Sequence, residues 1–205
     1  IATQFVNDNV DLIMANATPA LQAAMAATAD IPIVATSVTD FATALDIKDW
    51  TGKTGINVTG TADLAPLADQ AAMVKELLPD AKTVGVLYCS AEANSKYQAD
   101  VVTEELEKLG LEVKSYTVAD TNEIASVTTK ACSEVDCIYI PTDNTIASTT
   151  AAVNEIAAPA NIPIIAGEEG ICKGCGVATL SISYYSIGYE AGLMAYDILV
   201  NGKDP

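Results

Sequence analysis

Short apolar runs alternate with stretches of helical periodicity along most of the chain. Several runs carry apolar residues at consecutive positions, which is typical of strands buried on both faces of a parallel sheet. Between them, apolar residues recur every three or four positions, as in amphipathic helices. The pattern predicts an α/β fold in which helices cover parallel sheets. The predicted strands are Val10–Ala15, Ile31–Ala35, Val84–Tyr88, Val113–Val118, Cys137–Ile140 and Ile162–Ala166, and the predicted helices are Pro19–Thr28, Leu64–Leu78, Ser95–Leu109, Asn122–Ser133, Thr145–Ala158 and Tyr185–Val200.

The alternation breaks twice, and we interpret each break as a passage between two lobes. Thr36–Asp63 is rich in Thr, Asp and Gly and offers only the short apolar run Ile56–Val58 before the next helix. Later, a strand predicted within Val177–Ser183 leads into the final helix. Two such crossovers predict two doubly wound parallel-sheet lobes. The first lobe would comprise residues 1–80 and 184–205, and the second residues 81–183.

The composition favours a binding protein over an enzyme or a nucleic-acid-binding protein. Half of the 205 residues are apolar, enough for a sizeable core. A net charge of −17 repels nucleic acid and anionic membrane surfaces. The absence of histidine removes the usual general base at neutral pH and the commonest zinc ligand, and no G-x-S-x-G or phosphate-loop motif occurs. We therefore expect no enzymatic activity, no metal site, no cofactor and no nucleic-acid partner.

Polar loops follow the carboxyl ends of the predicted strands, where ligands bind in open parallel sheets. Helix N-termini at these loops present free N–H groups and attract anions. The hydroxyl-bearing loops of the first lobe suit a carboxylate, and the acidic loops of the second lobe suit an ammonium group. This split predicts a zwitterionic ligand such as an amino acid. The candidate residues are Thr18, Ser37 and Thr39 in the first lobe, and Ser90, Glu92, Asn94, Asp143, Asn144, Glu168 and Glu169 in the second.

Each loop residue also has a structural interpretation, because Ser, Thr, Asp and Asn at strand-to-helix turns often serve only as helix N-caps. Thr18, followed by Pro19, has the sequence of such a cap. Glu168 and Glu169 are less easily explained, since no helix is evident after them and adjacent carboxylates repel each other. We expect one of them to contact a cation. Tyr184, at the second crossover, either begins the last helix or forms a wall for an apolar or aromatic ligand side chain.

Six motifs extend over nearly the whole chain: ANATPA, TSVTD, NVTGTAD, YCSAEANS, IPTDN and GEEGICKGCGVATLSISYYSIGYEAG. Together they resemble ABC-transporter substrate-binding proteins of the tryptophan/tyrosine-binding type. The resemblance implies a class I periplasmic-binding-protein fold with a ligand cleft between the lobes. It also implies an extracellular location, as a membrane-anchored lipoprotein or a periplasmic protein, an ABC permease as partner, and aromatic amino acids as ligands. A complete family member has a further strand and helix before Ile1 and continues beyond Pro205, so we expect an incomplete first lobe.

The resemblance further implies roles for individual residues. Three hydroxyl-bearing residues stand where family members hold the ligand carboxylate, namely Thr18, Ser37 and Thr39. Asp143 and one of Glu168 and Glu169 stand where family members bind the ammonium group of the ligand. Five further residues would line the cleft near the hinge: Thr61, Asp63, Ser90, Glu92 and Asn94.

Five cysteines are an odd number for an exported protein, and the sequence leaves their pairing open. Cys172 and Cys175 form a CxxC motif in what reads as a Gly-rich loop before a strand, whereas thioredoxin-type chemistry needs this motif at a helix start. A zinc site would need two more ligands. Free thiols or a local disulfide are favoured, and Cys132 could pair with Cys137 in a second disulfide. Cys89 is the fifth cysteine.

Two other classes of function stay open from the sequence. The same clamp can be the sensory part of a receptor or regulator, which a kinase, chemoreceptor or helix-turn-helix segment in the same gene would indicate. An enzyme on a doubly wound fold would turn over a bound metabolite. The sequence leaves the identity of the solute and the oligomeric state open.

Overall fold

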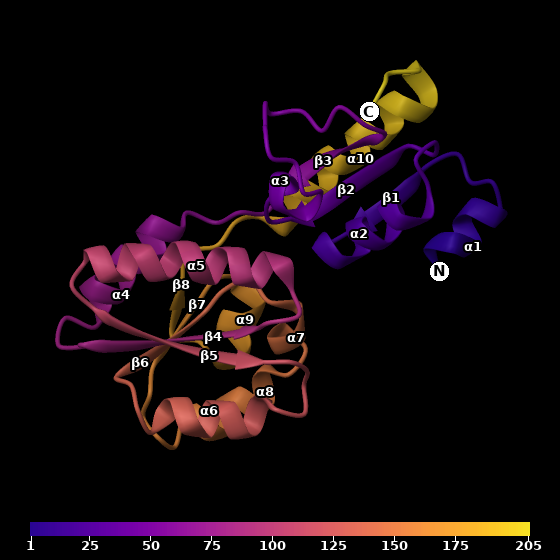
Figure 1. Cartoon of the computed structure of the whole chain (residues 1–205). Coiled ribbons are helices and arrows are strands. Elements are labelled where there is room, and N and C mark those ends of the chain that lie inside the picture. Colours follow the sequence, from indigo (N-terminus) through magenta and orange to yellow (C-terminus); the bar gives the residue numbers. More distant parts are fainter. The chain divides into compact units, whose positions relative to one another are not determined.

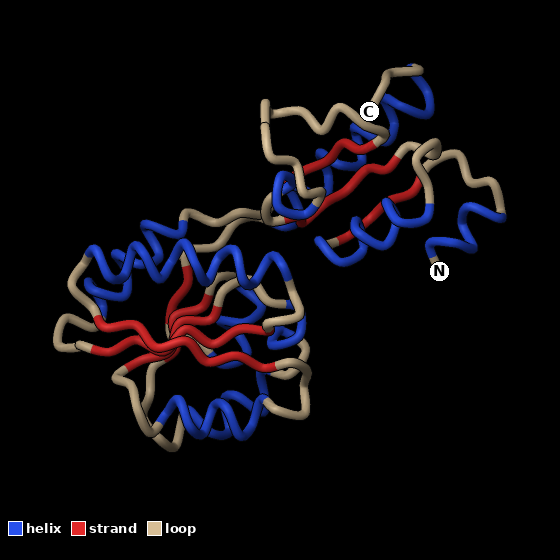
Figure 2. Tube along the Cα trace, in the orientation of Figure 1, coloured by secondary structure: helices blue, strands red, loops and turns tan.

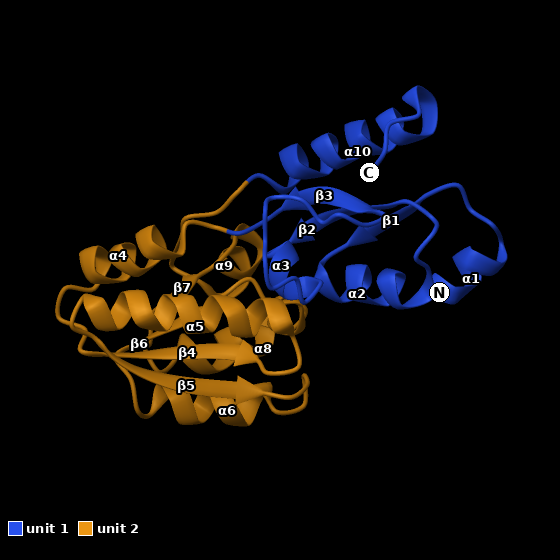
Figure 3. Cartoon of the chain, turned by 45° about the horizontal axis from the view of Figure 1, so that its top comes forward, with its two compact units in different colours: residues 1–64, 183–205 blue, residues 65–182 orange.

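A computed structural model describes residues 1–205, which divide into two compact units (Figure 3). Unit 1 comprises residues 1–64 and 183–205, and unit 2 comprises residues 65–182. The chain therefore leaves unit 1 after Leu64 and returns to it at Ser183. Each unit has a parallel sheet of its own, which confirms the predicted α/β class.

Unit 1 is built on a three-stranded parallel sheet in the order β1-β2-β3. Helix α2 contacts β1 and β2, whereas α10 contacts β2 and β3 from the opposite face of the sheet (Figure 3). Buried apolar side chains of α2 and the strands, among them Leu21, Ile33 and Val58, form the core between them. The elements are α1 (Ala2–Asn7), β1 (Ile13–Asn16), α2 (Thr18–Ala27), β2 (Ile33–Val38), α3 (Phe41–Ala44), β3 (Val58–Ala62) and α10 (Tyr184–Asn201).

Unit 2 is built on a five-stranded parallel sheet in the order β5-β4-β6-β7-β8. Figures 1 and 2 show this sheet with helices on both of its sides. All neighbouring strands pair in parallel, so their carboxyl ends lie at one edge of the sheet. The strands are β4 (Thr83–Cys89), β5 (Glu112–Val118), β6 (Cys137–Ile140), β7 (Ile164–Ala166) and β8 (Ala178–Thr179). The helices are α4 (Leu67–Leu77), α5 (Ala93–Lys108), α6 (Ile124–Cys132), α7 (Asn144–Ala147), α8 (Thr150–Ala157) and α9 (Glu169–Cys175).

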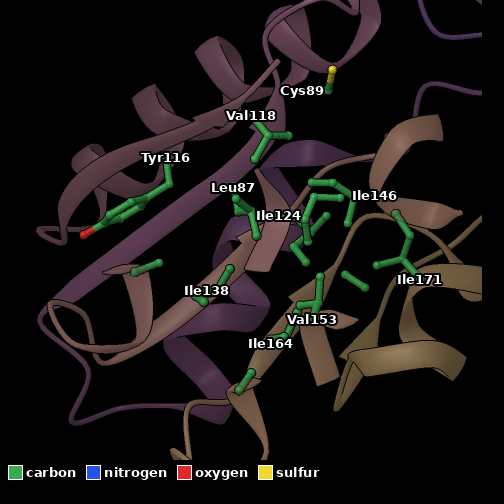
Figure 4. Packing of buried hydrophobic residues seen from close by; sticks show 14 of the residues in the cluster. Leu87, Cys89, Tyr116, Val118, Ile124, Ile138, Ile146, Val153, Ile164 and Ile171 are labelled. Atoms are coloured by element: carbon green, nitrogen blue, oxygen red, sulfur yellow. The ribbon is translucent and has the colours of Figure 1, made fainter. Parts of the chain in front are cut away.

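Both faces of the unit 2 sheet are buried, because successive strand residues point to opposite sides. In β6, Tyr139 packs with α4 and α5 on one face, while Ile138 and Ile140 pack with α6, α8 and α9 on the other. Figure 4 shows the second of these clusters, in which Leu87 and Ile138 meet helix residues such as Ile124 and Val153. Each fully buried side chain of this size stabilises the fold by roughly 1.5–3 kcal/mol, which fixes the strand ends that carry the candidate loops.

The structure corrects the predicted boundary between the lobes. Residues 65–80 were predicted in the first lobe, but they belong to unit 2. Helix α4 packs there against α5, and Ala71 and Val74 are buried in the same cluster as Val84 and Val102. The predicted helix over residues 145–158 is also interrupted, since α7 ends at Ala147 and α8 begins at Thr150.

Candidate functional site

The carboxyl end of β1 carries a strained turn. Ala17 has φ 78° and ψ 157°, a backbone conformation that is essentially reserved for glycine and costs about 1–3 kcal/mol in other residues. Its N–H donates to the carbonyl oxygen of Thr36 at 2.9 Å, which holds the turn against β2. Strain of this size persists where the surrounding structure enforces it, and it is concentrated at ligand sites.

Thr18 follows this turn as the first residue of α2, so the predicted N-cap role is wrong by one position. Ala17 is the N-cap and offers no side-chain oxygen to the free N–H groups of the first turn. The Thr18 side chain is only 3% exposed, and its Oγ1 is buried without a hydrogen-bond partner. A buried hydroxyl without a partner is costly, and here it lies at the positive end of a helix dipole.

The carboxyl end of β2 is irregular as well. Ser37 has φ 56°, and the pairing of β2 with β3 shifts register between Ala35 and Val38. Thr39, two residues beyond Ser37, is buried, and its Oγ1 donates to Oδ1 of Asp63 at 3.1 Å. The irregularity thus lets the chain turn from the sheet toward the buried carboxylate of Asp63.

Three predicted residues of unit 1, Thr61, Asp63 and Tyr184, lie near the connections to unit 2. Tyr184 is the first residue of α10, as one of its two predicted roles required, and its Oη donates to Oδ2 of Asp63 at 3.2 Å. Thr61 donates from Oγ1 to the carbonyl oxygen of Ile187, also in α10, at 3.1 Å. Asp63 therefore joins Thr39 to Tyr184, and Thr61 adds a bond from β3 to α10.

In unit 2, Glu92 is the most heavily hydrogen-bonded carboxylate. Its Oε1 accepts from the backbone N–H of Thr145 at 2.8 Å and from its hydroxyl at 2.7 Å, while Oε2 accepts from the N–H of Asn144 at 3.1 Å and from its side-chain amide at 2.6 Å. Burial alone raises the pKa of Glu92, but these hydrogen bonds outweigh it and lower the pKa below its ordinary value. An ionised Glu92 therefore holds the first turn of α7.

Asp143 is the N-cap of α7 and is 1% exposed. Oδ1 accepts from the N–H of Ile146 at 2.8 Å, and Oδ2 accepts from the N–H of Cys89 at 2.6 Å, which joins the ends of β4 and β6. Burial raises the pKa of Asp143 above its ordinary value. Each oxygen of a carboxylate can accept a further hydrogen bond, so capping does not exhaust this side chain.

Asn94 lies beside Glu92 at the first turn of α5 and is buried. Its Nδ2 donates to Oε2 of Glu92 at 3.2 Å and to the carbonyl oxygen of Thr142 at 3.3 Å. Asn94 Oδ1 and Thr142 Oγ1 are buried without a partner. Sequence reasoning missed Thr142, although its place between β6 and Asp143 was a usable signal. Ser90, in the same region, donates to the carbonyl oxygen of Val118 at 3.2 Å.

The expectation that no helix follows Glu168 and Glu169 is wrong. Glu168 is the N-cap of α9, and its carboxylate accepts from the N–H groups of Gly170, at 2.6 Å, and Ile171. Glu169 is exposed, and its Oε1 lies 2.5 Å from Nζ of Lys173. The cation that was expected to contact one of these carboxylates is therefore Lys173 of the same chain, one helical turn from Glu169.

The CxxC motif also lies in α9 and not in a loop. Cys172 and Cys175 are free thiols, as are the other three cysteines. Burial raises the pKa of Cys172, and it raises that of Cys175 to about 11. Such thiols are protonated at neutral pH, which disfavours nucleophilic or redox chemistry. No group of three or more Cys, Asp or Glu residues is placed to hold a metal ion.

One cavity of about 440 Å³ lies in unit 1. It is lined by side chains of the chain between α3 and β3, among them Trp50 and Lys53, and by Pro205. None of the predicted ligand-binding residues lines it. The cavity is therefore not part of the candidate site.

Comparison with known proteins gives consistent results. Residues 1–205 match the family model described as ABC transporter substrate binding protein. The chain is 40% identical over 199 residues to the tyrosine-binding protein of Clostridioides difficile (strain R20291), a match that covers 97% of this chain and 57% of that protein. The chain thus spans little more than half the length of this curated relative.

Two solved structures are similar over nearly all of the chain. The ABC domain from Streptococcus pneumonia in complex with L-Trp is 38% identical with a TM-score of 0.94, covering 100% of this chain and 70% of that one. A substrate binding protein with adhesive properties from Clostridium difficile, in a ligand-free, open structure, is 38% identical with a TM-score of 0.65. The match covers 98% of this chain and 68% of that one.

Proposed function

Because the chain belongs to the family of ABC transporter substrate-binding proteins, we propose that it binds an aromatic or other neutral amino acid for an ABC importer. Relatives described as tyrosine-binding and as a complex with L-Trp support this ligand class. The resemblance of the six motifs points to the same ligand class. Binding occurs without turnover, in keeping with a family of binding proteins.

One observation carries the assignment of a carboxylate-bearing ligand: the buried, unpartnered Oγ1 of Thr18 at the uncapped N-terminus of α2. A carboxylate at this position accepts from the hydroxyl and from free N–H groups of the first turn, and it is attracted by the helix dipole. The strain at Ala17 keeps the turn in one conformation, so little ordering is needed on binding. Ser37 and Thr39, at the end of the next strand, are the further candidates of unit 1.

The ammonium group is assigned to the acceptors at the strand ends of unit 2. Asn94 Oδ1 and Thr142 Oγ1 lack partners, and Asp143 supplies a buried carboxylate beside them. An ammonium group donates three hydrogen bonds, which suits two neutral acceptors and one carboxylate. Glu169 is the weakest of the predicted candidates, because it is exposed and paired with Lys173.

The partner is an ABC permease, and the location is extracellular, either as a membrane-anchored lipoprotein or in the periplasm. None of the helices is both long and apolar enough to cross a membrane. The net charge of −17 disfavours binding to anionic surfaces. Membrane fractionation and labelling with a radioactive fatty acid distinguish the anchored form from the free one.

A thermal-shift screen with the twenty amino acids, a sugar panel and nucleosides tests the proposed ligand class. A ligand at 100 times its Kd adds about 2.7 kcal/mol to the free energy of unfolding, which is a readily measured shift in Tm. We expect aromatic amino acids to give the largest shifts. Stabilisation by a sugar or a nucleoside, with none by an amino acid, would refute the proposal.

A further inference from the structure

Gln70 lies near the start of α4 and is completely buried in unit 2. Its Nε2 donates to the carbonyl oxygen of Leu180 at 2.8 Å and to that of Gly167 at 3.0 Å. Its Oε1 accepts from the phenol of Tyr139 at 2.5 Å. Both hydrogens of the amide and its oxygen are thus used. One side chain thereby joins strand β6, the loop after β7 and the chain after β8.

The loop after β7 and the chain after β8 are joined a second time. The N–H of Glu169 donates to Oγ of Ser181 at 3.2 Å. Strands β7 and β8 lead directly into these two segments and pair through Ala166 and Thr179. The two segments are thus held together both by backbone pairing and by side chains.

The loop after β7 and the chain after β8 have different roles in the structure. The loop at residues 167–169 carries Glu168, one of the candidate ligand residues. Residues 180–182 lead straight to Ser183, where the chain passes from unit 2 back to unit 1. The hydrogen bonds of Gln70 therefore run from a candidate ligand loop to one of the two connections between the units.

We propose that Gln70 is a positioning residue that makes loop 167–169 and connecting segment 180–182 respond together when ligand binds. The inference rests on the proposed function and extends its ligand site to loop 167–169, which carries the candidate Glu168. Without the amide, the buried carbonyl group of Gly167 and the part-buried carbonyl group of Leu180 lose their donor, and local opening becomes easier. Gln70 itself need not touch the ligand.

Hydrogen exchange of the ligand-free protein tests the positioning role. Gln70→Met keeps the length of the side chain but removes the amide, whereas Tyr139→Phe removes one partner and leaves both donated bonds in place. We expect Gln70→Met to raise exchange in residues 164–171 and 176–183 by about tenfold or more, with no change in β4 and β5. Tyr139→Phe leaves both segments at the wild-type rate. A uniform rise over unit 2 in Gln70→Met, or no rise in either segment, overturns the proposal.

The coupling is tested with L-tryptophan as the probe. In the wild type, ligand protects residues 164–171 and 176–183 together. In Gln70→Met it protects the first segment while the second stays at its ligand-free rate, and equal protection of both segments contradicts the coupling. If no amino acid binds the wild type, the proposed function fails, whereas the ligand-free comparison still decides the role of Gln70.

Ser181→Ala gives a second test that leaves the buried amide intact, should Gln70→Met fail to fold. It removes the acceptor of the Glu169 N–H at a partly exposed position. We expect a smaller rise in exchange, confined to the same two segments. Unchanged exchange in both segments would show that these side-chain links do not hold them, against the proposal.

Discussion

Tyr184 donates a hydrogen bond from its phenol to Oδ2 of Asp63 at 3.2 Å, across 121 positions of the sequence. Oδ1 of the same carboxylate accepts from Thr39 at 3.1 Å. The bond fastens the first residue of α10 to the chain beyond β3, so the two separate segments of unit 1 share one buried carboxylate. Sequence reasoning placed Asp63 and Tyr184 in the ligand site separately, whereas the structure makes them partners.

Tyr184→Phe is expected to lower the free energy of unfolding by about 1 kcal/mol, because Asp63 loses one donor while the ring is retained. Urea denaturation followed by circular dichroism measures the change. Tyr185→Phe is the matched control, since Tyr185 is the adjacent residue and is 82% exposed. Equal stabilities of the two variants would contradict the structural role of the Tyr184 hydroxyl.

Ala17→Gly is expected to raise the free energy of unfolding by about 1 kcal/mol. Relief of about 1–3 kcal/mol of backbone strain exceeds the greater entropy that glycine loses on folding. Ala23→Gly, at an exposed position in the interior of α2, should instead destabilise the protein by about 0.5–1 kcal/mol. Thermal unfolding of both variants checks the opposite signs. A destabilised Ala17→Gly protein would mean that the turn is not strained.

Glu92→Gln is expected to cost about 2 kcal/mol at pH 7, because an amide cannot accept all the hydrogen bonds that the carboxylate accepts. The folded-state pKa of Glu92 is lowered, so its stabilisation is present above the ordinary value of 4.5 and is lost as the pH falls through the folded pKa. The stability difference between wild type and variant should therefore shrink below about pH 4.5. Exposed Glu107→Gln serves as control. A difference that stays constant from pH 7 to pH 3 would exclude an ionised Glu92 as its source.

The native cysteines are expected to react slowly with iodoacetamide at pH 8, because burial raises the pKa of Cys175 to about 11 and that of Cys137 to about 12. In denaturant, all five should react. Mass spectrometry of the alkylated protein counts the modified thiols. Rapid native modification of Cys172 and Cys175 would revive a redox role for the CxxC motif.

Much of unit 2 could be predicted from sequence, because its strands are continuous apolar runs between helical patterns. The predicted strand over Cys137–Ile140 has the same bounds as β6. What the pattern could not provide is the sheet on which a helix packs. The periodicity of α4 defines an apolar face containing Ala71 and Val74, but only the folded chain shows that this face meets Val84 and Val102. The lobe boundary was misplaced for this reason.

Helix α9 could not be predicted from the sequence, because Gly170 and Gly174 lower its helix propensity. Gly174 is explained by packing: a Cβ there would lie 2.2 Å from Oγ1 of Thr150 at the start of α8. The missing helix also changed the interpretation of the candidate site. From the sequence, Glu168 was interpreted as a free carboxylate, although its side chain caps the N-terminus of α9. Loop position predicted which residues gather at the strand ends, but not which of them already serve the fold.

The most direct test of the account is calorimetric titration of wild type and Thr18→Val with L-tryptophan and with tryptamine, its analogue without a carboxylate. Thr43→Val, at an exposed position in unit 1, is the matched control. We predict that Thr18→Val weakens L-tryptophan binding by roughly tenfold or more and leaves the weak binding of tryptamine unchanged, because only the carboxylate accepts from the Thr18 hydroxyl. Equal affinity of wild type and Thr18→Val for L-tryptophan would contradict the assignment of the ligand carboxylate to the N-terminus of α2.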